Sequence, residues 1–185
     1  MQWASPEEVI EFWLDDIGPD GWYKQDEALD EEIRRRFMKT WETAGSGGLD
    51  EWTLRPQSAL ALLIVLDQFP RNMFRGVETA FSTDRKALCV AKKALATGFD
   101  LQIAEPERQF FYLPLMHSEC LTDQDRCVRL IMTRMPQHGG NNLPFAKEHR
   151  DVIRQFGRFP YRNEALGRTS TPAEQNFLVE HGYAA

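Results

Sequence analysis

Cysteine is scarce in this sequence. The three cysteines, Cys89, Cys120 and Cys127, are odd in number, and their spacing matches no paired metal-binding pattern such as C-x-x-C. A disulfide framework and a zinc ribbon are therefore not expected. Free thiols are typical of a reducing compartment, so we expect a cytoplasmic protein.

Long apolar runs are also missing. The longest, residues 59–66, has eight residues, whereas a membrane-spanning helix needs about 20. The first residues contain no basic region followed by an apolar core, so a signal peptide is not expected either. We therefore predict a protein with no membrane partner.

Positive charge is in deficit. The 22 Lys and Arg residues face 28 Asp and Glu residues, which gives a net charge of −6. An acidic chain repels a phosphate backbone, so nucleic acid is not an expected partner. The hydrophobic share of 42% and the charged share of 27% are ordinary for a folded globular protein.

Signals for β-structure are absent, whereas helix signals recur. No segment alternates with a period of two residues, and no Asn-Gly hairpin occurs. Ser5-Pro6-Glu7-Glu8 predicts a helix start with a capping box. A helix from Pro56 to Phe69, ended by Pro70, is apolar on all sides over residues 59–66, which is typical of a central helix.

The remaining helices are predicted from caps, prolines and glycines. They run from Asp26 to about Gly45, from Ser82 or Thr83 to Gly98, from Glu105 with a kink at Pro114, from Thr122 to about Met135, from Pro144 to about Phe156, and from Thr171 onward. Short connections favour antiparallel neighbours. We expect a single all-α domain over residues 1–185 with seven or eight helices.

Two polar clusters contain the sequence Phe-Pro followed by Arg-Asn. Asp67, Arg71, Asn72 and Arg75 follow the apolar central helix, where charged groups need partners because unpaired buried charge is costly. The segment 159–163 repeats the pattern with one inserted residue and contains Arg162 and Asn163. Both segments are also interpretable as turns that end a helix.

Two further clusters contain histidine. In the first, Tyr112, His117 and Glu119 lie around Pro114. The second spans residues 149–158 and contains His149, Asp151 and Arg158. Histidine near a carboxylate is suited to acid–base chemistry. Each cluster also has a structural interpretation, as a core histidine or a solvated helix face.

Several known chemistries have no sequence support. His117 and Glu119 do not share a helix face, and no H-E-x-x-H pattern is present, so no metal site is predicted. The G-x-S-x-G elbow and the phosphate-binding glycine loop are missing as well. We therefore predict no cofactor and assign no catalytic residue.

Together, three of these motifs resemble the DUF924 family of uncharacterised proteins. They are Asp67-Gln68-Phe69-Pro70-Arg71-Asn72, Tyr112-Leu113-Pro114 with Met116-His117-Ser118-Glu119, and the run from His149 to Pro160. Glu11-Phe12-Trp13 and the segment 18–22 extend the resemblance over about residues 6–178. It implies a helical fold similar to tetratricopeptide-repeat proteins, and two positions, Cys120 and Tyr161, depart from the pattern.

We consider three functions for these clusters. In the first, a concave cleft binds a small anionic molecule or an acidic peptide or protein partner, since arginine suits carboxylate and phosphate. In the second, His117 or His149 acts as a general acid or base in the same cleft. In the third, the clusters are buried salt bridges that join helices. The candidate site residues are Asp67, Arg71, Asn72, Arg75, Tyr112, His117, Glu119, His149, Asp151, Arg158, Arg162 and Asn163. The oligomeric state is not predicted.

Overall fold

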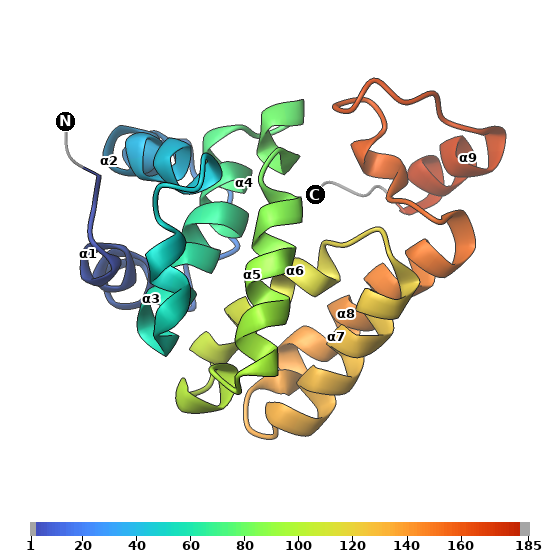
Figure 1. The fold of residues 1–185 in the computed structure, drawn as a ribbon. Coiled ribbons are helices and arrows are strands. Elements are labelled where there is room, and N and C mark those ends of the chain that lie inside the picture. The colour runs from blue at the N-terminus through green and yellow to red at the C-terminus, as the bar shows by residue number, and fades with distance from the viewer. Residues whose placement is uncertain (1–2, 182–185) are drawn as a thin grey trace.

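The structure is a computed structural model that describes residues 3–181 (Figure 1). Over these residues the chain forms helices joined by turns, and no strand is present. The predicted all-α class is confirmed. The tetratricopeptide-like superhelix and the extent of one domain stay predictions.

The first two helices begin where their capping residues predict. In α1 (Pro6–Ile10), the Glu8 N–H donates to Ser5 Oγ and the Ser5 N–H donates to a Glu8 carboxylate oxygen, which completes the capping box. This helix continues as the π-helical segment η1 (Glu11–Ile17) up to Gly18. Asp26 caps α2 (Glu27–Gly45) by accepting from two backbone N–H groups.

The central helix is longer than predicted. It runs through α3 (Pro56–Leu63), the π-helical segment η3 (Ile64–Gln68) and α4 (Phe69–Met73), so the predicted stop at Pro70 is wrong. The wide turn ends where Phe69 N bonds Ile64 O. Pro70 therefore lies in the first turn of α4, a position where proline is tolerated in a helix.

Two other prolines also act differently from prediction. Pro114 lies in the first turn of the short helix α6 (Leu113–Met116), which follows the 3-10 turn η6 (Glu107–Phe111), so it begins a helix instead of kinking one. Helix α8 (Gly139–Phe156) begins before Pro144 and contains it. The Gly139 N–H already bonds Met135 O, so the helix is established before the proline removes one ladder bond.

The other helices follow prediction more closely. Thr83 precedes α5 (Asp84–Ala96), but its hydroxyl donates to Leu66 O instead of capping the helix. Helix α7 (Leu121–Arg134) begins one residue before the predicted Thr122, and its N-cap residue, Cys120, makes no side-chain capping bond. Thr171 and Glu174 form a capping box at the start of α9 (Pro172–His181).

Short 3-10 turns connect these helices. They are η2 (Asp50–Leu54), η4 (Glu78–Phe81), η5 (Asp100–Gln102) and η7 (Pro160–Arg162). Residues 59–69 are all buried, so the interpretation of 59–66 as part of a central helix is correct. Most helices pack around it in one large hydrophobic core.

A second, smaller cluster lies at the carboxyl-terminal end. Val152, Ile153 and Phe159 pack with Phe156, Tyr161 and Phe177, apart from the main core. We call residues 157–181 the carboxyl-terminal segment; in Figure 1 it lies to one side of α4 and α5. Within residues 3–181 no helix is long and apolar enough to cross a membrane.

Candidate functional site

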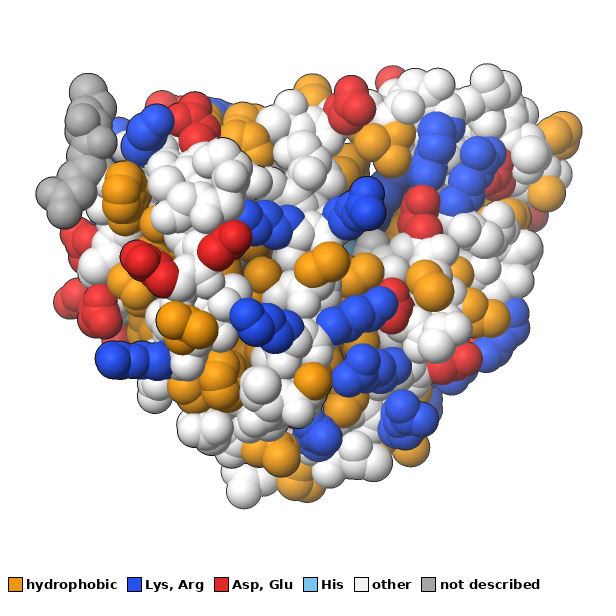
Figure 2. All heavy atoms as spheres, in the orientation of Figure 1, with side chains coloured by type: hydrophobic (Ala, Val, Ile, Leu, Met, Phe, Trp, Pro, Cys, Tyr) orange, Lys and Arg blue, Asp and Glu red, His pale blue; other side chains and the backbone are white. Residues whose placement is uncertain are grey.

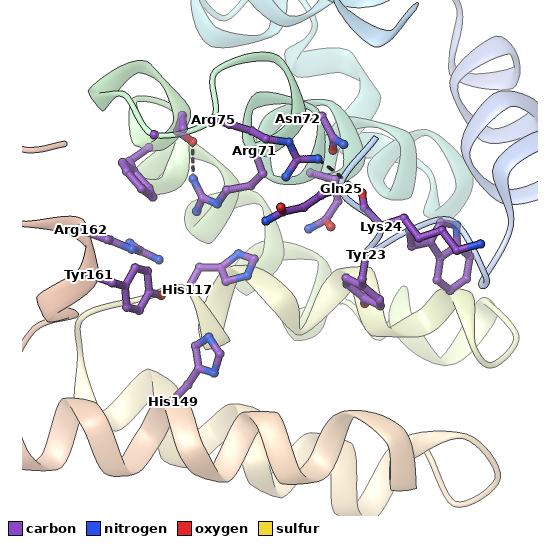
Figure 3. A pocket seen from close by; sticks show the side chains of 15 residues that line it. Tyr23, Lys24, Gln25, Arg71, Asn72, Arg75, His117, His149, Tyr161 and Arg162 are labelled. Carbon is purple, nitrogen blue, oxygen red and sulfur yellow. Dashed lines mark hydrogen bonds between the residues drawn. The ribbon is translucent and has the colours of Figure 1, made fainter. Parts of the chain in front are cut away.

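A cavity of about 360 Å³ lies between the main core and the carboxyl-terminal segment (Figure 3). We call it the central cavity. The loop after η1, the end of the central helix, the end of α6, the middle of α8 and η7 each contribute to its wall. Its lining consists of Trp22, Tyr23, Lys24, Gln25, Gln68, Arg71, Asn72, Arg75, Gly76, Ala80, Phe81, His117, His149, Tyr161 and Arg162.

Two arginines of the central cavity share one carboxylate. Arg71, on α4, donates to both carboxylate oxygens of Asp84, each at 2.8 Å, and also to the Ala80 carbonyl. Arg162, on η7, donates to Asp84 Oδ2 at 3.2 Å. Because one negative charge faces two permanent positive charges, this group of three carries one surplus positive charge.

Arg162 is the more deeply buried of the two arginines. Only 5% of its surface is exposed, and its Nε–H has no hydrogen-bond partner among the described residues. Its guanidinium carbon lies 4.6 Å from the Phe159 ring centre and 4.8 Å from that of Phe81. These aromatic contacts hold the charge in place without satisfying the donor.

A second arginine group closes the cavity towards α2. Arg75 forms a two-pronged ion pair with Asp30, with Arg75 Nη2 at 2.9 Å from Asp30 Oδ1. Asn72 Nδ2 donates to the same oxygen at 2.8 Å. Arg75 is thus held by a carboxylate of its own, which makes it a poorer candidate than Arg162 for a free anion.

A buried carboxylate orients His117 at the cavity wall. Asp67, in the π-helical segment, has only 1% of its surface exposed, and its Oδ1 lies 2.8 Å from His117 Nδ1. Gln68 Nε2 donates to the other oxygen at 2.6 Å. Burial raises the pKa of Asp67, but His117, Arg71 and the Gln68 amide outweigh it and hold that pKa below its ordinary value.

His149 projects from α8 towards His117 (Figure 3). Its Nδ1 lies 2.8 Å from the Phe145 carbonyl, to which it donates, and its ring packs edge-on against Phe159 at 5.4 Å. Burial, together with the nearby charges of His117 and Arg162, lowers the pKa of His149 to about 4. His149 is therefore neutral near pH 7.

The wall of the central cavity is cationic, and the carboxylates lie behind it. Lys24, Arg71, Arg75 and Arg162 line the cavity. Asp30 and Asp84 pair with arginines of this set from outside the lining, and Asp67 lies there against His117. Lys and Arg side chains also gather over the middle of one face of the molecule (Figure 2). An acidic chain thus presents a local positive site.

The structure brings six of the sequence-predicted residues together in the lining: Arg71, Asn72, Arg75, His117, His149 and Arg162. Asp67 lies directly behind them.

Five predicted site residues are not among the cavity lining. Tyr112 is fully buried and donates to Asp100, and Glu119 pairs with Arg168. Asp151 pairs with Arg150 and Arg154 on the surface. Arg158 pairs with Glu174, and Asn163 bonds Ser170 and Arg168. The pairs of Asp151 lie within α8, whereas those of Tyr112 and Glu119 join separate elements. The Glu119 pair with Arg168 anchors the carboxyl-terminal segment to the loop after α6, and the Arg158 pair with Glu174 lies within that segment.

The two Phe-Pro segments differ in structure. Phe69-Pro70 lies inside the central helix, so the interpretation as a helix-ending turn is wrong there. Near Phe159-Pro160 the helix ends earlier, at Gly157, whose φ of 71° is left-handed, and Pro160 begins η7. The segments nevertheless place Arg71 and Arg162 on the same carboxylate.

Sequence reasoning missed the two carboxylates that hold the arginines. Asp30 lies on the buried face of α2 with Ile33 and Phe37, at helical spacing. A lone carboxylate in such an apolar stripe predicts a buried ion pair. Asp84 looks like an ordinary acidic residue in the first turn of a helix, and no local pattern distinguishes it.

The described residues add no candidate metal-binding site. Over the described part of the chain, no group of three or more His, Cys, Asp or Glu side chains is placed to hold a metal ion.

Comparisons with known proteins give a family but no function. The model of the family described as "Bacterial protein of unknown function (DUF924)" matches residues 9–182. The fold is similar to the solved structure of ATU0120, a protein of unknown function from Agrobacterium tumefaciens. The TM-score is 0.89 at 40% sequence identity, covering 95% of this chain and 97% of that one. No curated protein matches.

Proposed function

The chain belongs to the DUF924 family of bacterial proteins of unknown function, and we propose that it binds a small oxyanion in the central cavity. The bound group is a phosphate or a carboxylate. Arg162 and Arg71 are its principal partners.

The observation that carries this proposal is the unpartnered Nε–H of Arg162. A buried donor without an acceptor costs about 1–3 kcal/mol, and a buried charge with half a counter-ion costs more. Arg162 has both features, since its Nε–H lacks a partner and it shares Asp84 with Arg71. A bound oxyanion supplies the missing acceptor and the missing negative charge together.

The dimensions of the central cavity favour a small molecule over a peptide. Its volume of about 360 Å³ lies at the lower end of the range for ligand pockets, which is about 300–1,000 Å³. Aromatic side chains of Trp22, Phe81 and Tyr161 form part of the wall and supply apolar surface for the remainder of the ligand. Peptide binding is therefore an outcome of the test and not the proposal.

The direct test is isothermal titration of the purified protein with inorganic phosphate and with acetate. We expect saturable binding of at least one anion by the wild type. Arg162→Lys keeps the charge but loses the Nε–H, so affinity should fall at least tenfold, or about 1.4 kcal/mol. Arg158→Lys is the matched control, since Arg158 pairs with Glu174 outside the cavity lining, and it should bind as the wild type does.

Three results decide between the interpretations. Loss of binding in a folded Arg162→Lys variant supports the proposal. Equal binding by both lysine variants places the anion elsewhere and overturns it. Binding of neither anion, with a large loss of stability in Arg71→Ala, favours the salt-bridge interpretation and directs the search to acidic peptides and protein partners.

A further inference from the structure

The anion site lies beside a carboxylate-oriented histidine. Arg71, Arg162 and His117 all line the central cavity, and they come from α4, η7 and the end of α6 (Figure 3). We propose that the protein hydrolyses small phosphate monoesters, with His117 as the general acid that protonates the leaving oxygen. This inference rests on the proposed anion site and adds a reaction to it.

The contact with Asp67 determines which nitrogen of His117 can react. Asp67 stays ionised because its pKa is held low, so His117 Nδ1 carries the hydrogen in their 2.8 Å contact. The other ring nitrogen, Nε2, then faces away from Asp67, and His117 has 18% of its side chain exposed. A histidine oriented in this way by a carboxylate exchanges protons through a single, fixed nitrogen.

The arrangement of donors favours phosphate over carboxylate. A planar carboxylate is satisfied by one guanidinium fork in its own plane, as Asp84 is by Arg71. Tetrahedral phosphate offers oxygens in several directions. Arg71, Arg162 and His117 approach the same part of the cavity from three different elements, which suits the tetrahedral group (Figure 3).

The reaction balances with water as the only co-reactant. The oxygen of a water molecule forms a bond to phosphorus while the bond from phosphorus to the ester oxygen breaks. Protonated His117 transfers its Nε2 proton to the departing alkoxide, which leaves as an alcohol. The attacking water gives up one proton, which restores protonated His117, and the second product is inorganic phosphate.

Asp67 is a positioning residue in this scheme. It orients the His117 ring through Nδ1 and is itself fixed by Gln68 Nε2 at 2.6 Å. Asp67 also lies in the π-helical segment η3 of the central helix. Such segments are rare and frequently occur at functional sites.

A purely structural role for the pair is the competing explanation. Asp67 and His117 join the central helix to α6, and their removal would lower stability under either interpretation. Activity must therefore be measured in a way that depends on proton donation. The chemistry of the leaving group provides that dependence.

The experiment compares glycerol 2-phosphate with p-nitrophenyl phosphate. An alkoxide needs a proton in order to leave, whereas p-nitrophenolate leaves readily without one. His117→Gln should lower turnover of glycerol 2-phosphate by about 10²–10⁴-fold, the usual contribution of a general acid, and that of p-nitrophenyl phosphate by less than about tenfold. Asp67→Asn should show the same split with a smaller loss.

His138→Gln is the matched control and should keep wild-type turnover of both esters, because His138 is exposed and does not line the central cavity. Circular dichroism and melting temperatures establish that each variant is folded, and inorganic phosphate binding establishes that the anion site is intact. If His117→Gln does not fold, the leaving-group split in Asp67→Asn decides the question.

Two results would overturn the inference. One is a wild type that binds inorganic phosphate and hydrolyses neither ester, which leaves the anion-binding function standing alone. The other is an equal loss on both esters in variants that bind phosphate normally. A wild type that binds acetate but not phosphate also overturns the inference and leaves the anion site standing, whereas one that binds neither anion overturns the anion site itself, so the two failures are distinguishable.

Discussion

Asp84 is the residue on which the two halves of the central cavity depend. It accepts from Arg71 of the main core and from Arg162 of the carboxyl-terminal segment. Shared in this way, it contacts both guanidinium groups and balances only one of their two charges. Single substitutions in this group separate its structural role from its binding role.

Arg71→Ala should destabilise the protein by about 1–3 kcal/mol, because it removes a two-pronged partner from Asp84. The loss should be smaller than the 3–5 kcal/mol typical of a fully buried pair, since the two side chains keep 23% and 20% exposure and Arg162 remains. Urea unfolding measures the change. Arg154 lies on the surface, so the free energy of unfolding of Arg154→Ala should be within about 0.5 kcal/mol of the wild-type value. An equally small change in Arg71→Ala would contradict the prediction.

His149 should make stability depend on pH between about 6.5 and 4. Its folded-state pKa of about 4 lies below its ordinary value of 6.5, so the unfolded chain takes up a proton first as the pH falls. Stability should therefore decrease across this window, by up to about 2 kcal/mol after allowance for partial exposure of the ring. The effect should disappear in His149→Phe, as measured by unfolding at pH 7.5 and 4.5.

A His149→Phe variant that loses stability over the same window as the wild type would assign the dependence to another group. Asp67, whose pKa is lowered, affects stability at lower pH, since its contribution is lost only as the pH falls through its folded-state pKa.

Candidate residues were predictable where burial demanded a partner. Arg71, Arg75 and Asp67 were identified because they follow an apolar helix, and all three lie in or behind the cavity wall. Tyr112 and Arg158 lie in polar sequence clusters, which predicts that they share the site. They pair locally instead, with Asp100 and Glu174. The choice of partner is a three-dimensional property that no local pattern contains.

At the scale of the elements, three predicted caps were reliable, whereas Thr83 makes no capping bond and Pro70, Pro114 and Pro144 act differently from prediction. Ser5, Asp26 and Thr171 each precede a helix as predicted, because capping depends on residues within one turn. Pro70 and Pro144 were expected to bound helices and lie within them. The effect of a proline depends on the hydrogen bonds of the turn before it. Before Pro70 this is a π turn, which the amino-acid composition does not predict.

Gly157 ends α8 in a left-handed backbone conformation that is unfavourable for residues with a Cβ atom. Its φ is 71° and its N–H bonds Ile153 O at 2.8 Å. Gly157→Ala should therefore cost about 1–2 kcal/mol, although no atom within 4 Å of the new Cβ opposes it.

Gly140 provides the matched comparison, since it is exposed in the same helix, has no atom within 4 Å of an added Cβ and has no left-handed φ. Gly140→Ala should stabilise the protein by up to about 1 kcal/mol. Thermal unfolding measures both changes, and shifts of the same sign would refute the conformational explanation.

At the scale of the whole molecule, the central cavity lies between two hydrophobic clusters of unequal size. Polar links join the carboxyl-terminal segment to the rest of the molecule, including Arg168 to Glu119 and Arg162 to Asp84. A segment with few apolar contacts opens at lower free energy than the core does. Its position should therefore respond to a ligand that contacts both sides.

Amide hydrogen exchange tests this expectation. Without ligand, residues 159–180 should exchange faster than residues 59–69 of the central helix. Saturating inorganic phosphate should slow exchange at residues 160–163, and Arg162→Lys should abolish that protection. Uniform protection of both regions in the absence of phosphate would show that the segment is as stable as the core.

The fold class was predictable from the missing period-two pattern and the recurring caps, because both are local. The cavity was not. It joins residues 22–25, 68–81, 117, 149 and 161–162, and no spacing in the chain indicates that these segments meet. Their convergence depends on the placement of the carboxyl-terminal segment, which follows α8 and lies to one side of α4 and α5 (Figure 1).

The unpartnered Nε–H of Arg162 has a consequence for how the family evolves. A buried donor that lowers stability without a ligand is kept only while binding is selected, since stability alone favours an apolar residue of similar size. A lineage that no longer meets the anion would be expected to replace Arg162 with leucine or methionine and to become more stable. If the proposed anion site is correct, retention or loss of this one side chain would distinguish relatives that bind the anion from those that do not.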